Sequence, residues 1–172
     1  MSKLLLLLLL FPLIFACEGN TAARKTARGE NFVSDPDHLY FKNTRARHYA
    51  AEEVAERATI YRHDALFASD ANLRPALIDN WLQDRAVVRF ELEGVAPGWA
   101  LEAKDDDGWR RVPLSTPPTN EELGALNGIL LGNAGLRIIA RKDTLPAFSE
   151  SSGRKEARTV LTDYLRLVGY GG

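Results

Sequence analysis

Hydrophobic and polar residues alternate one by one in several segments of the chain, and this alternation predicts strands. From 86 to 93 the even-numbered residues are hydrophobic and most of the odd-numbered ones are charged. Such a period of two is typical of a strand with one buried face. The same period recurs over 99–103 and 109–114, with Asp107-Gly108 between them. Because Asp-Gly between two alternating runs favours a tight turn, we expect a hairpin. A fourth strand is predicted over 136–140, which is rich in Ile and Leu.

Two later segments repeat hydrophobic residues every three to four positions, which is the period of a helix with one buried face. The clearer one is 154–168, and Gly169 follows it where a left-handed residue ends many helices. The other begins at Thr119, with Glu122 three residues later, and ends at Gly132. Thr and Glu at this spacing predict a capping box, in which each side chain bonds the other residue's backbone amide.

The first third of the chain has a less regular pattern. Ser34-Asp35-Pro36 has the composition of a helix start. Alanine and glutamate predict a helix over 46–57, followed by a short strand over 58–62. A further helix is expected from Arg74-Pro75 to about residue 82, because hydrophobic residues recur there at helical spacing.

These elements together predict an α+β domain over residues 34–172. We expect a small, mostly antiparallel sheet of about four to five strands, flanked by about three to four helices, in a single domain. The helix at 154–168 is the best candidate to cover the apolar face of the sheet. Short strands joined by hairpins exclude the parallel sheet of a nucleotide-binding fold.

The N-terminus has a different pattern, with Lys3 followed by an apolar run from Leu4 to Ala16. A helix that spans a membrane needs about 20 apolar residues, so this run is too short and reads instead as an export signal. The run ends in Ile14-Phe15-Ala16-Cys17, which resembles the lipobox of bacterial lipoproteins. The resemblance implies cleavage after residue 16 and a lipid on the thiol of Cys17. The alternative is an ordinary secretory signal, but the chain's single cysteine is at the position that lipidation requires.

Residues 17–33 are small, polar and without a repeat, which predicts a flexible tether between the lipidated cysteine and the domain. Its cations Arg24, Lys25 and Arg28 favour contact with anionic headgroups, although a solubilising linker is the simpler interpretation. In lipoproteins of enteric bacteria the residue after the cysteine directs sorting between membranes. Glu18 is not the aspartate typical of inner-membrane retention, so the resemblance favours the outer membrane.

Charge and motifs exclude several classes of function. The chain has 22 basic and 23 acidic side chains, which argues against binding to nucleic acid. No nucleotide-binding or hydrolase motif occurs, so we expect no cofactor. We also expect no metal, because His38, His48 and His63 lack the spacing of zinc ligands and an acylated Cys17 leaves no thiolate. The acidic run Asp105–Asp107 is interpreted as a solvated turn rather than a calcium loop.

The segment from 40 to 49 is the best candidate for a partner-binding surface, because it mixes aromatic rings with cations. Arginine and tyrosine suit such surfaces, since they combine bidentate hydrogen bonds with stacking. The candidate residues are Tyr40, Arg45, Arg47 and Tyr49.

The sequence therefore favours a membrane-anchored envelope lipoprotein that binds another envelope protein or contributes to an assembly, without catalysis. The alternative is a small cell-wall hydrolase or carbohydrate-binding protein that uses Asp and Glu side chains with His48 or His63. A third possibility is a binder of a small ligand with an aromatic pocket, for which Trp81, Trp99 and Trp109 are candidates.

Overall fold

The three-dimensional structure is a computed structural model. It describes residues 35–54, 58–80, 83, 85–92, 95, 97–141 and 143–170. The predicted signal, Cys17 and the predicted tether lie outside the described residues, as do Trp81 and Leu82.

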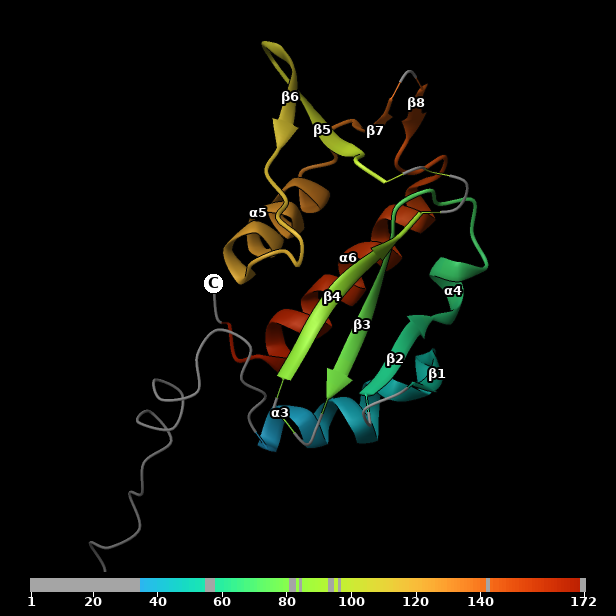
Figure 1. Ribbon diagram of the computed structural model, residues 1–172, viewed down its shortest axis with the longest axis vertical. Helices are drawn as coiled ribbons and strands as arrows, with labels where there is room; N and C mark the ends of the chain where they lie inside the picture. Colours follow the sequence, from blue (N-terminus) through green and yellow to red (C-terminus); the bar gives the residue numbers. More distant parts are fainter. Residues whose placement is uncertain are drawn as a thin grey trace, which may run out of the picture.

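The described chain forms two antiparallel sheets of four strands each, so the predicted α+β class is confirmed. Sheet A has its strands in the order β1-β2-β3-β4, the order in which the chain runs (Figure 1). Its strands are β1 (Tyr49–Val54), β2 (Ala58–His63), β3 (Arg74–Asn80) and β4 (Arg85–Glu91). β4 is therefore an edge strand of sheet A.

Sheet B lies at one end of the molecule, in the order β6-β5-β7-β8 (Figure 1). Its strands are β5 (Ala100–Asp105), β6 (Gly108–Val112), β7 (Leu136–Ala140) and β8 (Asp143–Pro146). The predicted hairpin is present, and Asp105 Oδ1 accepts a hydrogen bond from the amide of Asp107 at 2.9 Å. The aspartate run is thus the turn of a hairpin, as expected.

The helices are α3 (Asp35–Tyr40), α4 (Asp64–Phe67), α5 (Asn120–Leu131) and α6 (Ser151–Leu167). A π-helical turn (Phe41–Arg45) and a 3-10 turn (Ala46–His48) connect α3 to β1. The predicted capping box is present, because Thr119 Oγ1 accepts from the amide of Glu122 and Glu122 Oε2 accepts from the amide of Thr119, at 3.2 and 2.8 Å. Gly169 has a φ of 66°, as predicted for the end of α6. No helix among the described residues is long and apolar enough to cross a membrane.

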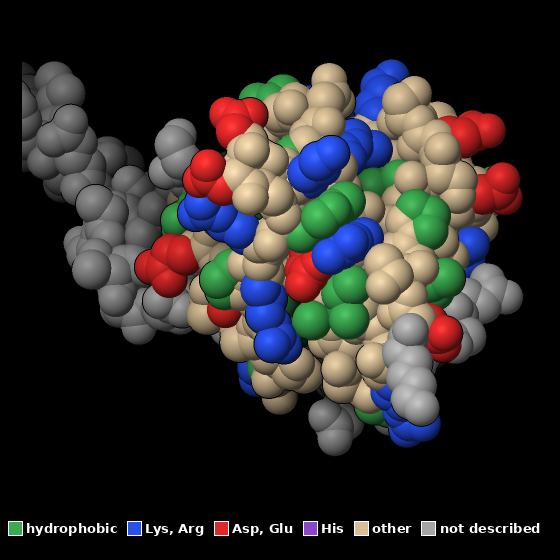
Figure 2. Space-filling model, turned by 90° about the horizontal axis from the view of Figure 1, so that it is seen from above, with side chains coloured by type: hydrophobic (Ala, Val, Ile, Leu, Met, Phe, Trp, Pro, Cys, Tyr) green, Lys and Arg blue, Asp and Glu red, His purple; other side chains and the backbone are tan. Residues whose placement is uncertain are grey.

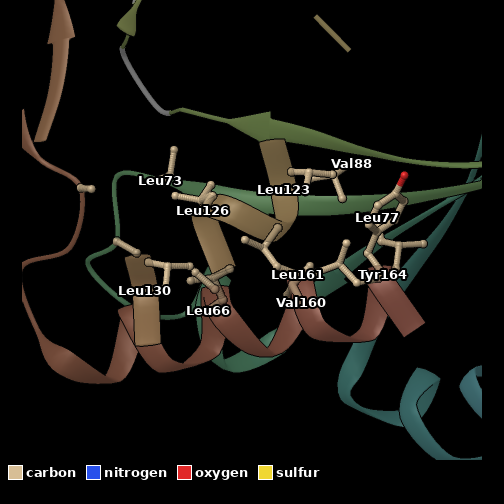
Figure 3. Close-up of a cluster of buried hydrophobic side chains, with 14 of the residues drawn as sticks. Leu66, Leu73, Leu77, Val88, Leu123, Leu126, Leu130, Val160, Leu161 and Tyr164 are labelled. Carbon is tan, nitrogen blue, oxygen red and sulfur yellow. The ribbon is translucent and has the colours of Figure 1, made fainter. Parts of the chain in front are cut away.

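The hydrophobic core lies where α6 packs against both α5 and sheet A. α6 runs along β3 and β4, so the helix predicted to cover the sheet does so (Figure 1). Figure 3 shows the side chains of this core pointing toward one another from α4, α5, α6, β3, β4 and residue 73, just before β3. Its labelled members are Leu66, Leu73, Leu77, Val88, Leu123, Leu126, Leu130, Val160, Leu161 and Tyr164.

The helix predicted over 46–57 is wrong, because residues 49–54 are strand β1. Its alanines and glutamates favour a helix, but intrinsic propensity is weaker than the gain from pairing with β2. Residue 49 pairs with 63 and residue 54 with 58, in one continuous register.

The helix predicted from Arg74 to about residue 82 is also wrong, since Arg74–Asn80 is strand β3. β3 lies between β2 and β4, and its residues 75–77 and 79 are all buried. A strand covered on both faces has no alternation of polar and hydrophobic residues, so its pattern resembles that of a helix.

Candidate functional site

A groove of about 410 Å³ lies between β3 and β4 of sheet A and the segment that leads from β6 to α5. This volume is in the range of ligand pockets in proteins, roughly 300–1,000 Å³. β3 and β4 form one side and the 114–118 segment the other, and the ends of β5 and β6 close it. The lining residues are Ile78, Val87, Val88, Arg89, Phe90, Gly98, Trp99, Ala100, Leu101, Arg111, Val112, Leu114, Ser115, Thr116, Pro117 and Pro118.

The capping box of α5 holds the 114–118 wall in place. Besides its bond to Thr119, the Glu122 carboxylate accepts from Ser115 Oγ at 2.7 Å and from the Ser115 amide at 3.0 Å. These hydrogen bonds hold the pKa of Glu122 below its usual value, with the Ser115 side chain as the largest cause. A charged Glu122 therefore fixes the start of α5 and one wall of the groove together. The wall also contains a cis peptide bond between Thr116 and Pro117.

The interior of the groove is apolar and includes an aromatic pair. Val88, Leu101 and Val112 are buried at its base. The rings of Phe90 and Trp99 pack edge to face, with their centroids 6.0 Å apart. Such a surface favours hydrophobic groups of a ligand, and aromatic edges add orientation to that preference.

Two arginines line the groove, and they differ in their partners. Arg89 forms an ion pair with Glu91, which also accepts from Arg62 at 2.8 Å. Arg111 is exposed, and no residue in the described part of the chain forms an ion pair or side-chain hydrogen bond with it. Arg111 is therefore a cation available to a carboxylate or phosphate of a ligand.

The end of the molecule that carries sheet B shows the same mixture of side chains on its surface. Figure 2 looks onto this end, where basic side chains lie next to hydrophobic ones in the middle of the face. Trp109 is 39% exposed there, and the guanidinium of Arg137 lies 4.1 Å from the centroid of its ring. Of the three tryptophans, Trp99 lines the groove and Trp109 lies on this outer surface.

Two of the predicted partner-binding residues make an internal network with α6. Arg45 Nε lies 2.9 and 3.0 Å from the two carboxylate oxygens of Asp163, and Tyr49 OH donates to Asp163 Oδ2 at 2.6 Å. Tyr49 is only 6% exposed. Burial, reinforced by the Asp163 carboxylate, raises the pKa of the Tyr49 phenol. The structure therefore gives Arg45 and Tyr49 a role in joining the 41–49 segment to α6.

The other two predicted partner-binding residues are more accessible. Tyr40 is half-buried under the guanidinium of Arg166, which lies 3.7 Å from the centroid of its ring. Arg47 is exposed, and its Nε lies 3.3 Å from His48 Nε2. The four candidates thus divide into an internal pair and two residues at the surface.

A second polar cluster surrounds Asp79, a side chain with no exposed surface. His38 Nε2 lies 3.0 Å from Asp79 Oδ2, and Lys42 Nζ lies 3.5 Å from the same atom. Lys42 also donates to the hydroxyl of Tyr61. The other oxygen, Asp79 Oδ1, has no hydrogen-bond partner in the described structure. Sequence reasoning missed Asp79 and Asp163, although a single carboxylate inside a hydrophobic stretch is a signal for the first.

His63, one of the two histidines considered for catalysis, is buried at 6% exposure. Its Nε2 lies 3.6 Å from a carboxylate oxygen of Glu156, and its ring packs edge to face on Tyr49 at 5.0 Å between centroids. Its Nδ1 has no hydrogen-bond partner within the described residues. His48 is exposed, and neither histidine lines the groove.

We expect His63 to make stability fall in mild acid. Burial lowers the pKa of its imidazole below 6.5, against the opposing effect of Glu156 and Asp163, so the unfolded chain binds a proton more readily than the folded one. The contribution of neutral His63 to the free energy of unfolding is therefore present above about pH 6.5 and is lost as the pH falls through the folded pKa. The free energy of unfolding should fall by at most about 1.4 kcal/mol per pH unit. Urea unfolding between pH 7 and 5 measures this slope. His63→Phe should flatten it and His48→Gln should leave it unchanged; an unaltered slope in the His63 variant would contradict the assignment.

Within the described residues, no group of three or more His, Asp or Glu side chains is arranged to hold a metal ion. In comparisons with known proteins, no family model, no curated protein and no solved structure matches the chain.

Proposed function

We propose that this protein is a lipid-anchored, non-catalytic binding module of the bacterial cell envelope, and that it holds an envelope partner in the groove beside β4. The lipobox resemblance at Cys17 supports the anchor. Glu18 supports the outer membrane over the inner one. A tether of about 16 residues lets the domain reach a partner some 20–25 Å from the bilayer.

The observation that carries the proposal is the composition of the groove. It combines an apolar base and an aromatic pair with Arg111, a cation without an ion-pair partner in the described structure. Concave apolar surfaces with a few well-placed polar groups are the usual form of binding sites.

The same composition favours binding over hydrolysis. The described residues that line the groove include no aspartate, glutamate or histidine, so they provide no general acid or base of the kind a cell-wall hydrolase uses. Asp79, Asp163 and His63 do not line the groove. Their carboxylates and imidazole are bound to other side chains of the domain.

The anchor is tested by fractionation and labelling. We expect the intact protein to sediment with membranes and to incorporate an alkyne-tagged fatty acid. Cys17→Ala should be unlabelled and should leave the membrane fraction. A variant that stays on the membrane without label would contradict lipidation at this residue.

The groove is tested by photocrosslinking in intact cells. A photoreactive amino acid in place of Thr116, an exposed residue of the groove, should give a discrete adduct with an envelope protein. The same group in place of Leu131, which is 62% exposed on α5 and does not line the groove, is the matched control. Arg111→Glu should abolish the adduct at position 116. Equal adducts from both positions, or none from either, would overturn the groove as the binding site.

A further inference from the structure

The groove is too small to be the whole contact surface of a protein partner. Specific interfaces between proteins bury about 800 Å² on each side. A volume of about 410 Å³ is instead typical of a site for a small ligand or for a few side chains. A protein held in the groove therefore also covers surface next to it.

The cations of sheet A next to the groove are already paired. Arg89 and Arg62 both form ion pairs with Glu91, and Arg62 also pairs with Glu52. Their charges are largely neutralised within the domain, so this side of the groove does not select a charged partner.

Sheet B, on the other side, turns one face to the core and leaves the other exposed. Leu101 and Val112 are paired across β5 and β6, and both are buried. Side chains alternate along a strand, so Lys104 on β5 and Trp109 and Arg111 on β6 lie on the opposite, outer face. Figure 2 looks onto this end of the molecule, where basic and hydrophobic side chains lie together.

Arg111 connects this outer face to the groove, because it lies on the face and also lines the groove. Lys104 is its diagonal neighbour on β5, about 7–8 Å away from strand to strand. Both side chains are exposed, and neither forms an ion pair with a residue in the described part of the chain. Two unpaired cations thus lead from the groove onto sheet B.

Trp109 is fixed on the same face by its neighbours. The guanidinium of Arg137 lies 4.1 Å from the centroid of the Trp109 ring, and Arg137 Nε donates to Glu102 Oε2 at 2.8 Å. A Cβ at Gly135 would lie 3.3 Å from Trp109 Cη2, so the glycine leaves room for the ring. Trp109 is still 39% exposed. Tryptophan and arginine held in advance are the residue types that contribute most energy to protein interfaces.

The charge of the outer face selects the partner. Its strands carry the three cations named above and one acid, Glu102, which Arg137 already binds. The acidic turn 105–107 lies at the end of the hairpin, where Arg110 pairs with two of its carboxylates. A partner with an acidic surface is therefore complementary to this face, and a basic one is not.

We propose that the binding surface continues from the groove across the outer face of sheet B and recognises an acidic surface of the partner protein. Arg111 and Lys104 pair with its carboxylates, and the stacked Trp109 and Arg137 pack against it. This inference rests on the proposed function, because it extends the site in the groove and specifies the chemistry of the partner.

The extension is tested first by photocrosslinking in cells. A photoreactive amino acid in place of Thr144, which is exposed on the outer face of β8 and does not line the groove, should crosslink the same protein as position 116. Lys104→Glu should reduce both adducts about tenfold or more, because a like charge then faces the acidic partner. Lys104→Arg should retain both. Lys155→Glu reverses an exposed cation on α6 and is the matched control, which should leave both adducts unchanged.

These outcomes separate the extension from the proposed function. The extension fails, and the groove stands as the binding site, if the adduct at position 116 persists in Lys104→Glu while position 144 gives no adduct or captures a different protein. No adduct from either position rejects both.

NMR with two blocked peptides of opposite charge tests the recognition of acidic groups directly. The mature chain from residue 17 with Cys17→Ala is titrated to millimolar concentration with Glu-Leu-Glu-Val-Glu or with Lys-Leu-Lys-Val-Lys. The acidic peptide should shift the amides of Lys104 and Arg111 and the indole N–H of Trp109, assigned with Trp109→Phe, and the basic peptide should not. Lys104→Glu should weaken binding of the acidic peptide about tenfold or more.

Equal shifts from the two peptides would overturn the recognition of acidic groups. Shifts confined to the groove around Trp99 would overturn the extension onto sheet B. Sedimentation with phosphatidylglycerol vesicles that is lost in Lys104→Glu, without an adduct at position 144, would also overturn it, because the face would then recognise a membrane instead of a protein.

Discussion

Replacing Leu126 with alanine is expected to lower the free energy of unfolding by about 3 kcal/mol, within a usual range of 2–5 kcal/mol for buried leucines. Leu126 has no exposed surface and lies in the core between α5, α6 and β3, as Figure 3 shows. Alanine removes its hydrophobic contacts and leaves a cavity that close-packed neighbours fill only in part. Urea unfolding monitored by circular dichroism measures the change.

Leu131 provides a matched control on the same helix. It is 62% exposed, so Leu131→Ala should change stability by less than about 0.5 kcal/mol. Both substitutions replace leucine with alanine in α5, and these two residue types have similar helix propensities, so the difference between the two losses mainly reports burial. Similar losses at both positions would mean that α5 is not packed on the core. The groove would then lose one wall, because Glu122 of α5 holds Ser115.

How well the sequence predicted each strand depended on how many of its faces are buried. In β4 and in β5, one face of the strand is more exposed than the other. The alternation of hydrophobic and polar residues was therefore sufficient to predict both strands. β3 is covered on both faces, so hydrophobic residues are consecutive and the period of two is lost. Only its pairing with two neighbours distinguishes it from a helix, and a single sequence does not contain that information.

β1 was missed for a different reason. Its residues Ala50, Ala51, Glu52 and Glu53 are exposed and favour a helix, so local preference and native structure disagree. Two contacts outweigh that preference: the full register with β2 and the burial of Tyr49 against His63 and Phe41. The preceding turn from 41 to 48 is also held by a contact that is distant in sequence, the hydrogen bond from Arg45 to Asp163.

The groove and the carboxylates of the polar clusters likewise could not be predicted from the sequence alone. The walls of the groove come from residues 78 to 118, and only the sheet pairings and the capping box bring them together. The arginines and tyrosines of the 40–49 segment led to its prediction as a partner-binding surface, and this stays a prediction. Their acceptor, Asp163, lies 118 residues after Arg45, on α6.

Replacing Asp163 with alanine is expected to lower the free energy of unfolding by about 3 kcal/mol, as for other ion pairs broken on one side in a protein interior. Asp163 is 9% exposed, and its loss leaves the Arg45 guanidinium and the Tyr49 hydroxyl without their acceptor. Asp107→Ala is the control, because its ion pair with Arg110 is at an exposed turn and should contribute less than about 1 kcal/mol. Tyr49→Phe removes a single hydrogen bond and should cost about 1 kcal/mol. In a double-mutant cycle, Asp163→Ala should cost less in the Tyr49→Phe background than in the wild type.

The stability measured for Asp163→Ala decides how the arginines of the 40–49 segment are to be tested for partner binding. A large loss in Asp163→Ala means that Arg45→Ala also unfolds part of the population, so a lost partner would report folding rather than contact. Arg47, which is exposed and bonded only to the neighbouring His48, is then the residue of this segment at which a surface contact is measurable. A loss below about 1 kcal/mol in Asp163→Ala, the level of a surface pair, would instead show that Arg45 and Tyr49 are held weakly. They would then be available to a partner, and the segment would compete with the groove as the binding surface.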